Sequence, residues 1–154
     1  MESVVATSTF DGDLEDLISY CRTLNSRSNW PGAVLEWEKP ETLYWQVGVR
    51  LKAASMVEIE VEERLGGIVR FVDGRVRFDT TQRGAWPHGH MDSACEYLFT
   101  RGEGGPHRLQ LTYNYVTPPP TLVRTRDLPK YHQAMERVIG AYATKLTTKV
   151  PATT

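Results

Sequence analysis

The sequence has few cysteines, no excess of either charge and no long apolar run. Its 154 residues include two cysteines, Cys21 and Cys95, whose surroundings match no metal-ligand spacing, so we expect two reduced and separate thiols. The formal net charge is −1, from 18 basic and 19 acidic residues, and therefore predicts no binding to nucleic acid. No apolar run approaches the roughly 20 residues of a membrane-spanning helix.

The start of the chain lacks the features of a targeting signal. The segment MESVVATSTF has no basic region and no long apolar core, so we expect no signal peptide and a cytoplasmic protein. With 40% hydrophobic and 24% charged residues, the composition is typical of a globular domain with a sizeable core. We expect one domain over residues 1–150, a disordered tail over residues 151–154, and a monomer or homodimer.

The longest periodic stretch runs from Leu128 to Val150. Its apolar residues recur every three or four positions, which predicts an α-helix with one apolar face. They are Leu128, Tyr131, Met135, Val138, Tyr142 and Leu146. Asp127 is a candidate N-cap, and Pro151 is expected to stop the helix. Gly140 lies in the middle, which indicates a bend, close approach of a ligand, or close contact with a strand.

Most of the preceding chain alternates between apolar and polar residues, as β-strands with one buried face do. Strands are expected at residues 3–10, 33–38, 43–51, 57–61, 68–72, 75–82, 91–99 and 107–116, with a loop at 83–89. Asp73-Gly74 between two such runs predicts a hairpin.

A short helix is expected after the first strand, because four apolar residues follow at helical spacing, with Asp13 or Asp11 as its cap. They are Leu14, Leu17, Ile18 and Cys21. The segment NSRSN, residues 25–29, breaks this helix or adds a short second one. The predicted fold class is α+β: about seven antiparallel strands curved around the long C-terminal helix, with a closed barrel as the alternative.

This order of elements resembles the helix-grip fold of the START-like, polyketide cyclase and plant-allergen superfamily (SRPBCC), over residues 3–150. The local likenesses are Trp30-Pro31 after the short helices, the turn from Gly102 to Pro106 before an alternating strand, and the closing helix. The resemblance implies a deep cavity between the sheet and the terminal helix for lipids, polyketides, hormones or other hydrophobic molecules. Some members are cyclases, aromatases or lyases, and others bind and carry.

In such a fold the cavity is lined by the inward strand positions and by the helix stripe. Alternation gives the inward strand positions as Leu35, Trp37, Trp45, Val47, Val49, Val57, Ile59, Val61, Val76, Phe78, Thr80, Ser93, Cys95, Tyr97, Phe99, Leu109, Leu111, Tyr113 and Tyr115. We expect ligand contacts from Trp37, Trp45, Val47, Phe78, Trp86, Ser93, Cys95, Tyr97, Leu111, Met135, Val138 and Tyr142. No charged residue is among them, and Glu58, Glu60, Glu62 and Glu63 are expected on an acidic outer face. A register error of one residue would instead bring in Arg50, Arg70, Arg77, Glu96 or Asn114.

The candidate catalytic residues are Tyr113, Tyr115, His88 and His90. A tyrosine hydroxyl can donate a hydrogen bond to a developing enolate, although buried tyrosines often serve as core residues. The two histidines belong to a loop that could reach the cavity mouth, and a solvated loop is the alternative. Metal binding by His88 and His90 would need a third ligand that the spacing does not supply, so we expect no metal. Cys95 is expected to be a small buried hydrophobe.

These observations favour a cofactor-independent biosynthetic enzyme of the cyclase or aromatase kind, which would fold a flexible apolar substrate until its reacting atoms meet. The alternative is a non-catalytic carrier or sensor of a lipid-like or other hydrophobic ligand. A third interpretation is a protein-interaction module that uses the acidic face of the sheet. A cavity filled by side chains would favour the module, a smooth apolar cavity the carrier, and converging hydroxyls the enzyme.

Overall fold

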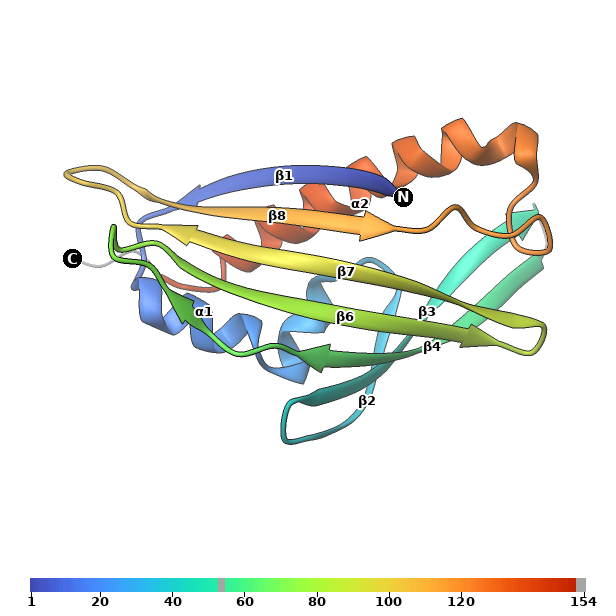
Figure 1. The fold of residues 1–154 in the computed structure, drawn as a ribbon, viewed down its shortest axis with the longest axis horizontal. Coiled ribbons are helices and arrows are strands. Elements are labelled where there is room, and N and C mark those ends of the chain that lie inside the picture. Colours follow the sequence, from blue (N-terminus) through green and yellow to red (C-terminus); the bar gives the residue numbers. More distant parts are fainter. Residues whose placement is uncertain (53–54, 152–154) are drawn as a thin grey trace.

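The computed structural model describes residues 1–52 and 55–151. The elements follow the chain in this order (Figure 1): β1 (Glu2–Phe10), α1 (Leu14–Cys21), the 3₁₀ helix η1 (Leu24–Asn29), β2 (Ala33–Lys39), β3 (Thr42–Lys52), β4 (Ser55–Leu65), β5 (Val69–Arg70), β6 (Val76–Trp86), β7 (Gly89–Thr100), β8 (His107–Tyr115), the 3₁₀ helix η2 (Thr125–Asp127) and α2 (Leu128–Thr147). Residues 152–154 of the predicted tail, and the side chains of Val49 and Arg50, lie outside what the structure describes.

The strands form one antiparallel sheet in the order β1-β8-β7-β6-β4-β3-β2, with the short β5 paired to β6. β1 and β2 are the two edges, so the sheet is open and the closed-barrel alternative is wrong. α2 packs on β1 and β8, and α1 packs in the same core as the second half of α2 (Figure 1). The predicted α+β helix-grip architecture is therefore confirmed. No helix of the described residues is long and apolar enough to cross a membrane.

The helix α2 begins at Leu128, as predicted, and ends at Thr147 rather than at Val150. Its first turn follows the 3₁₀ helix η2, and Asp127 is the N-cap residue, as predicted, although its side chain makes no capping hydrogen bond. The last turn is fastened to β1, because the hydroxyls of Thr147 and Ser8 are 2.7 Å apart. The buried residues of α2 all lie in its second half. They are Ile139, Tyr142, Ala143, Leu146 and Thr147.

The N-terminal elements follow the predicted pattern closely. Asp13 caps α1 by accepting a hydrogen bond from the backbone N–H of Asp16 at 2.9 Å, and the apolar face of α1 is buried. The Asp73-Gly74 hairpin is confirmed between β5 and β6, where Gly74 has a positive φ of 91°. Cys21 is buried and free, as is Cys95, so the prediction of two separate thiols is also confirmed.

The predicted loop at residues 83–89 is instead the tip of a long hairpin. β6 continues to Trp86 and β7 starts at Gly89. Gly84 is part of this strand for a packing reason, because a Cβ at this position would lie 2.8 Å from Cγ2 of Ile59 on β4. The glycines indicated a loop in the sequence, whereas Gly84 permits close approach within the sheet.

Trp37 faces outward, contrary to the prediction. The pairing of β2 with β3 shifts between Leu35 and Trp37, which is a β-bulge, so Trp37 is opposite Tyr44 instead of following the alternation. The two rings stack at 3.8 Å on the outer face, and Trp37 is 51% exposed. One extra residue thus moves the side chain to the other face of the sheet.

Candidate functional site

A cavity of about 770 Å³ lies between the sheet and α2. This volume is within the range of roughly 300–1,000 Å³ that is usual for small-molecule sites. Its wall combines residues of η1, β3, β4, β6, β7 and β8 with the segment 120–124 and the first half of α2. The predicted residues that lie in this wall are Trp45, Val47, Ile59, Val61, Ser93, Cys95, Tyr97, Tyr113, Tyr115, Tyr131, Met135, Val138 and Tyr142.

Four predicted ligand contacts lie elsewhere. Trp37 is on the outer face because of the bulge, and Phe78 is covered by Tyr97, whose ring stacks on it at 4.5 Å. Leu111 is fully buried in the same core cluster as Phe78, and Trp86 is buried in a second apolar cluster, which contains wall residues such as Trp45 although Trp86 itself does not line the cavity. Phe78, Trp86 and Leu111 therefore face inward, but the cavity reaches only part of each strand.

The two loop histidines do not contribute to the cavity wall. His88 is at the tip of the β6–β7 hairpin, His90 is at the start of β7, and both side chains are exposed. Neither histidine lines the cavity, although the neighbouring residues Gly84 and Met91 do, so the structure brings neither of them into the wall. Among the described residues, no three His, Cys, Asp or Glu side chains gather where they could hold a metal ion.

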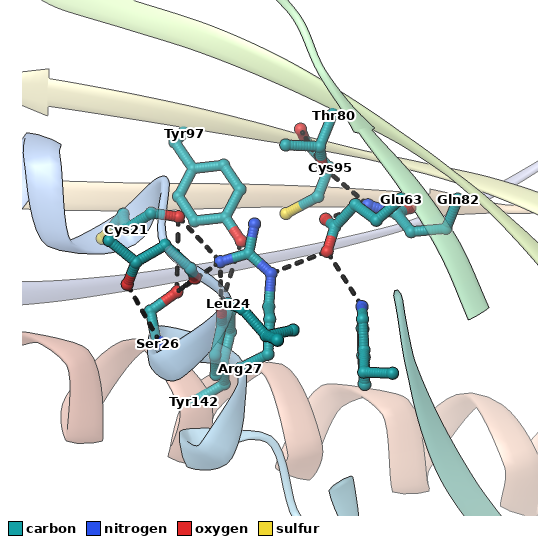
Figure 2. A network of polar contacts seen from close by, with 12 residues as sticks. Cys21, Leu24, Ser26, Arg27, Glu63, Thr80, Gln82, Cys95, Tyr97 and Tyr142 are labelled. Atoms are coloured by element: carbon teal, nitrogen blue, oxygen red, sulfur yellow. Dashed lines mark hydrogen bonds and ion pairs between the residues drawn. The ribbon is translucent and has the colours of Figure 1, made fainter. Parts of the chain in front are cut away.

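The main departure from prediction is an ion pair buried in the cavity wall. Nε of Arg27 on η1 donates to Oε1 of Glu63 on β4 at 2.7 Å, and both side chains are nearly inaccessible, at 1% and 2% exposure (Figure 2). The prediction that the cavity has no charged residue, and that Glu63 belongs to the outer acidic face, is wrong. Glu63 continues the inward alternation of Val61 on the same strand.

Further donors complete the surroundings of the Glu63 carboxylate. Oε1 also accepts from Nε1 of Trp45 at 3.1 Å, and Oε2 accepts from Nε2 of Gln82 at 2.7 Å (Figure 2). Burial by itself would raise the pKa of Glu63, but the charge of Arg27 and the hydrogen bonds from Arg27, Gln82 and Thr80 outweigh it and lower the pKa below its usual value. Glu63 is therefore an ionised carboxylate held in place.

Arg27 connects this carboxylate to the helices. Its Nη1 donates to the backbone oxygen of Cys21 at 2.7 Å and to the hydroxyl of Tyr142 at 2.9 Å, and its guanidinium lies over the ring of Tyr97 (Figure 2). Nη2 is buried and has no hydrogen-bond partner among the described residues.

Several hydroxyls are linked to the ion pair by hydrogen bonds. The hydroxyls of Tyr97 and Tyr142 are 3.1 Å apart, and Ser93 donates to Gln82 at 2.8 Å. Burial raises the pKa of Tyr113 to about 12, although its hydrogen bond with Ser93 lowers it in part. Burial likewise raises the pKa of Tyr97 and of Tyr142. At neutral pH these tyrosines are therefore neutral groups that can donate hydrogen bonds.

Cys95 lies among these hydroxyls but is not suited to be a nucleophile. It is buried, and burial strongly raises the pKa of its thiol, with the negative charge of Glu63 adding to the effect. A thiol with a raised pKa contains little of the reactive thiolate at neutral pH. The geometry agrees with the prediction that Cys95 serves as a small buried hydrophobe.

The outer part of the cavity is formed by aromatic residues and the start of α2. The rings of Tyr113 and Tyr115 stack at 5.9 Å, and Tyr131 meets Tyr115 edge-on at 5.5 Å. The hydroxyl of Tyr115 is 2.6 Å from Nδ1 of His132, a residue that the sequence analysis did not select. His132 follows Tyr131 of the apolar stripe, and this position next to a cavity-facing residue was the only hint in the sequence that His132 lies near the cavity.

No protein-family model and no curated protein sequence matches this chain. Solved structures do match in fold. A conserved protein from Geobacillus kaustophilus has a TM-score of 0.74 at 11% identity, over 96% of this chain and 94% of that chain. The Zhui aromatase/cyclase from Streptomyces sp. R1128 has a TM-score of 0.63 at 14% identity, over 96% of this chain and 92% of that chain.

A START superfamily protein from Mycobacterium smegmatis also matches, with a TM-score of 0.50 at 11% identity over 96% of this chain and 99% of that chain. At such low identities the similarity establishes the fold and nothing finer. The chain has the START-like helix-grip fold, and the resemblance seen in the order of its elements is confirmed.

Proposed function

We propose that this protein binds a mainly apolar, carbonyl-bearing molecule in the cavity and catalyses its cyclisation, as a polyketide-type cyclase or aromatase would. One observation carries the proposal. The cavity is apolar along much of its wall, but the hydroxyls of Tyr97, Tyr142 and Ser93 join the buried pair of Arg27 and Glu63 in one hydrogen-bonded network within that wall. The fold similarity to an aromatase/cyclase structure supports the same class of reaction.

The chemistry follows from the kind of groups that converge there. Apolar residues such as Val47, Met135 and Val138 favour a folded, flexible substrate by removing its surface from water. Neutral tyrosines, above all Tyr113, donate hydrogen bonds to a carbonyl oxygen as it gains negative charge. Holding reacting atoms in contact can lower a barrier by as much as ~7–11 kcal/mol in favourable intramolecular cases.

The proposal is tested with a substrate identified by mass spectrometry of molecules that co-purify with the native protein. Single-turnover kinetics of Tyr113→Phe should then show a loss of about 100-fold, the usual cost of removing an oxyanion donor. The melting temperature and substrate affinity should change little. A variant that keeps the parental rate would contradict the role of Tyr113, and an unchanged co-purified molecule after incubation would favour the carrier.

The carrier remains the second candidate, because an enclosed apolar cavity is sufficient for transport. It predicts tight binding of an intact molecule without turnover. The third interpretation, a protein-interaction module, loses its main support because the cavity is open rather than filled by side chains.

A further inference from the structure

Tyr115 and His132 form a pair that joins the cavity to the protein surface. Tyr115 is the last residue of β8 and lies in the cavity wall, and its hydroxyl is 2.6 Å from Nδ1 of His132 on α2. The side chain of His132 is 34% exposed. Oε2 of Glu2 on β1 lies 3.9 Å from Nδ1, the nitrogen that also meets Tyr115, and Oε1 of Glu136 lies 3.5 Å from Nε2.

Asp92, Arg124, Asp127 and Lys130 also line the cavity, whereas the fully buried ionisable groups of the wall are poorly suited to exchange protons at neutral pH. Arg27 and Glu63 hold each other in their charged forms. Tyr97, Tyr142 and Cys95 are buried without an imidazole partner among the described residues. The Tyr115–His132 pair differs because it has one member in the wall and the other in contact with water.

We propose that Tyr115 is the catalytic residue for proton removal and that His132 is the positioning residue that receives the proton through it. This inference rests on the proposed cyclase function. The substrate class is a ketone with a C–H bond next to its carbonyl. The relay requires the tautomer in which Nδ1 of His132 accepts the hydrogen bond of the Tyr115 hydroxyl and Nε2, the nitrogen nearer Glu136, carries the ring proton.

The step balances as a proton relay. The C–H bond of the ketone breaks, its electron pair stays on the substrate as an enolate, and the proton goes to the Tyr115 oxygen. At the same time the Tyr115 O–H proton moves to Nδ1 of His132. The resulting imidazolium faces the carboxylates of Glu2 and Glu136, and it returns the proton to water or to the cyclised product.

The test uses β-tetralone, a small bicyclic ketone, as the probe. Deuterium uptake at its benzylic carbon next to the carbonyl is followed by NMR in heavy water, and binding in the cavity is followed by displacement of Nile red. His132→Asn keeps a polar atom beside Tyr115 but cannot bind the proton. His88→Asn is the matched control, because it removes an exposed histidine outside the cavity wall.

We expect wild-type protein and His88→Asn to accelerate uptake equally, with a rate that rises as one histidine loses its proton. Tyr115→Phe and His132→Asn should lose about 100-fold, within the usual range for a general base, and His132→Asn should also lose the histidine inflection in its pH profile. Melting temperature and probe binding should persist in both variants.

The outcomes separate the two proposals. Failure of wild-type protein to bind the ketone overturns the proposed function and the relay with it. Binding without acceleration, or acceleration that both variants retain with the same pH profile, overturns the relay alone. A loss of rate in His132→Asn without loss of the inflection would assign His132 a purely structural role and would also overturn it.

Discussion

Breaking the buried pair of Arg27 and Glu63 should be the most destabilising single change in the cavity wall. Glu63→Gln retains the shape of the side chain but removes its charge. The carboxylate now receives three donors, from Arg27, Trp45 and Gln82. A glutamine would present its NH₂ group to one of these donors and would leave the Arg27 guanidinium buried without its counter-charge.

The expected cost follows from the burial of both partners. Removing one member of a fully buried pair typically costs about 3–5 kcal/mol, because the remaining charge is uncompensated. A domain of this size has roughly 5–15 kcal/mol of stability, so the loss is a large share of it. At about 2–4 °C per kcal/mol, the melting temperature of Glu63→Gln should fall by roughly 6–20 °C. Arg27→Met should have a similar effect.

A double-mutant cycle separates the pair from its surroundings. Urea unfolding is followed by tryptophan fluorescence for wild type, Arg27→Met, Glu63→Gln and the double variant. The double variant contains no unpaired charge, so it should be less destabilised than the sum of the single variants by about 2 kcal/mol or more. Additive losses to within about 0.5 kcal/mol would refute the argument that the two side chains stabilise each other.

The same pair predicts a dependence on pH. The pKa of Glu63 is lower in the folded protein than the unfolded value of about 4.3. Its contribution is therefore fully present above that pH, and it is lost as the pH falls below it towards the folded pKa. The difference in stability between wild type and Glu63→Gln should be smaller at about pH 3 than at about pH 7, and a constant difference would contradict the assignment.

Three further predictions concern the cavity, the terminal helix and the hairpin tip. Val47→Trp, whose side chain would enter the cavity, should abolish stoichiometric Nile red binding with little loss of stability, whereas Leu111→Trp should overpack the core and cost about 1–3 kcal/mol in urea unfolding. Gly140→Ala should stabilise the protein by up to about 1 kcal/mol in the same assay, because an added Cβ meets no atom within 4 Å, and a loss of stability would show a contact that this geometry lacks. His88→Ala and His90→Ala should leave single-turnover rates within a few-fold of wild type, and a large loss would return these residues to the site.

Periodicity was sufficient to predict the sheet, the short helix and the start of the terminal helix. The alternation also placed Glu63 inside, in step with Val61, but its charge led us to assign it to the outer face. A buried carboxylate needs a partner, and that partner, Arg27, belongs to a short 3₁₀ helix far away in the sequence. No local pattern links the two positions.

Two other misses have the same origin in contacts that are not local. Trp37 left the alternation because of a bulge whose position depends on the pairing of β2 with β3. His132 reaches the wall residue Tyr115 because the end of β8 lies beside the first turns of α2. Register and the approach of distant elements determine both, and a single sequence carries little information about either.

The pairing of β1 with β8 affects how the chain can fold during synthesis. Glu2 pairs with Tyr115 and Phe10 with His107, so β1 leaves the ribosome long before its partner strand β8. Until β8 emerges, Val4 and Phe10 have no sheet to join, and pairing over such a sequence distance is slow. α2 then packs on β1 and ties Thr147 to Ser8. A nascent chain that stalls before Tyr115 would therefore expose an unpaired apolar strand, the kind of segment that chaperones bind.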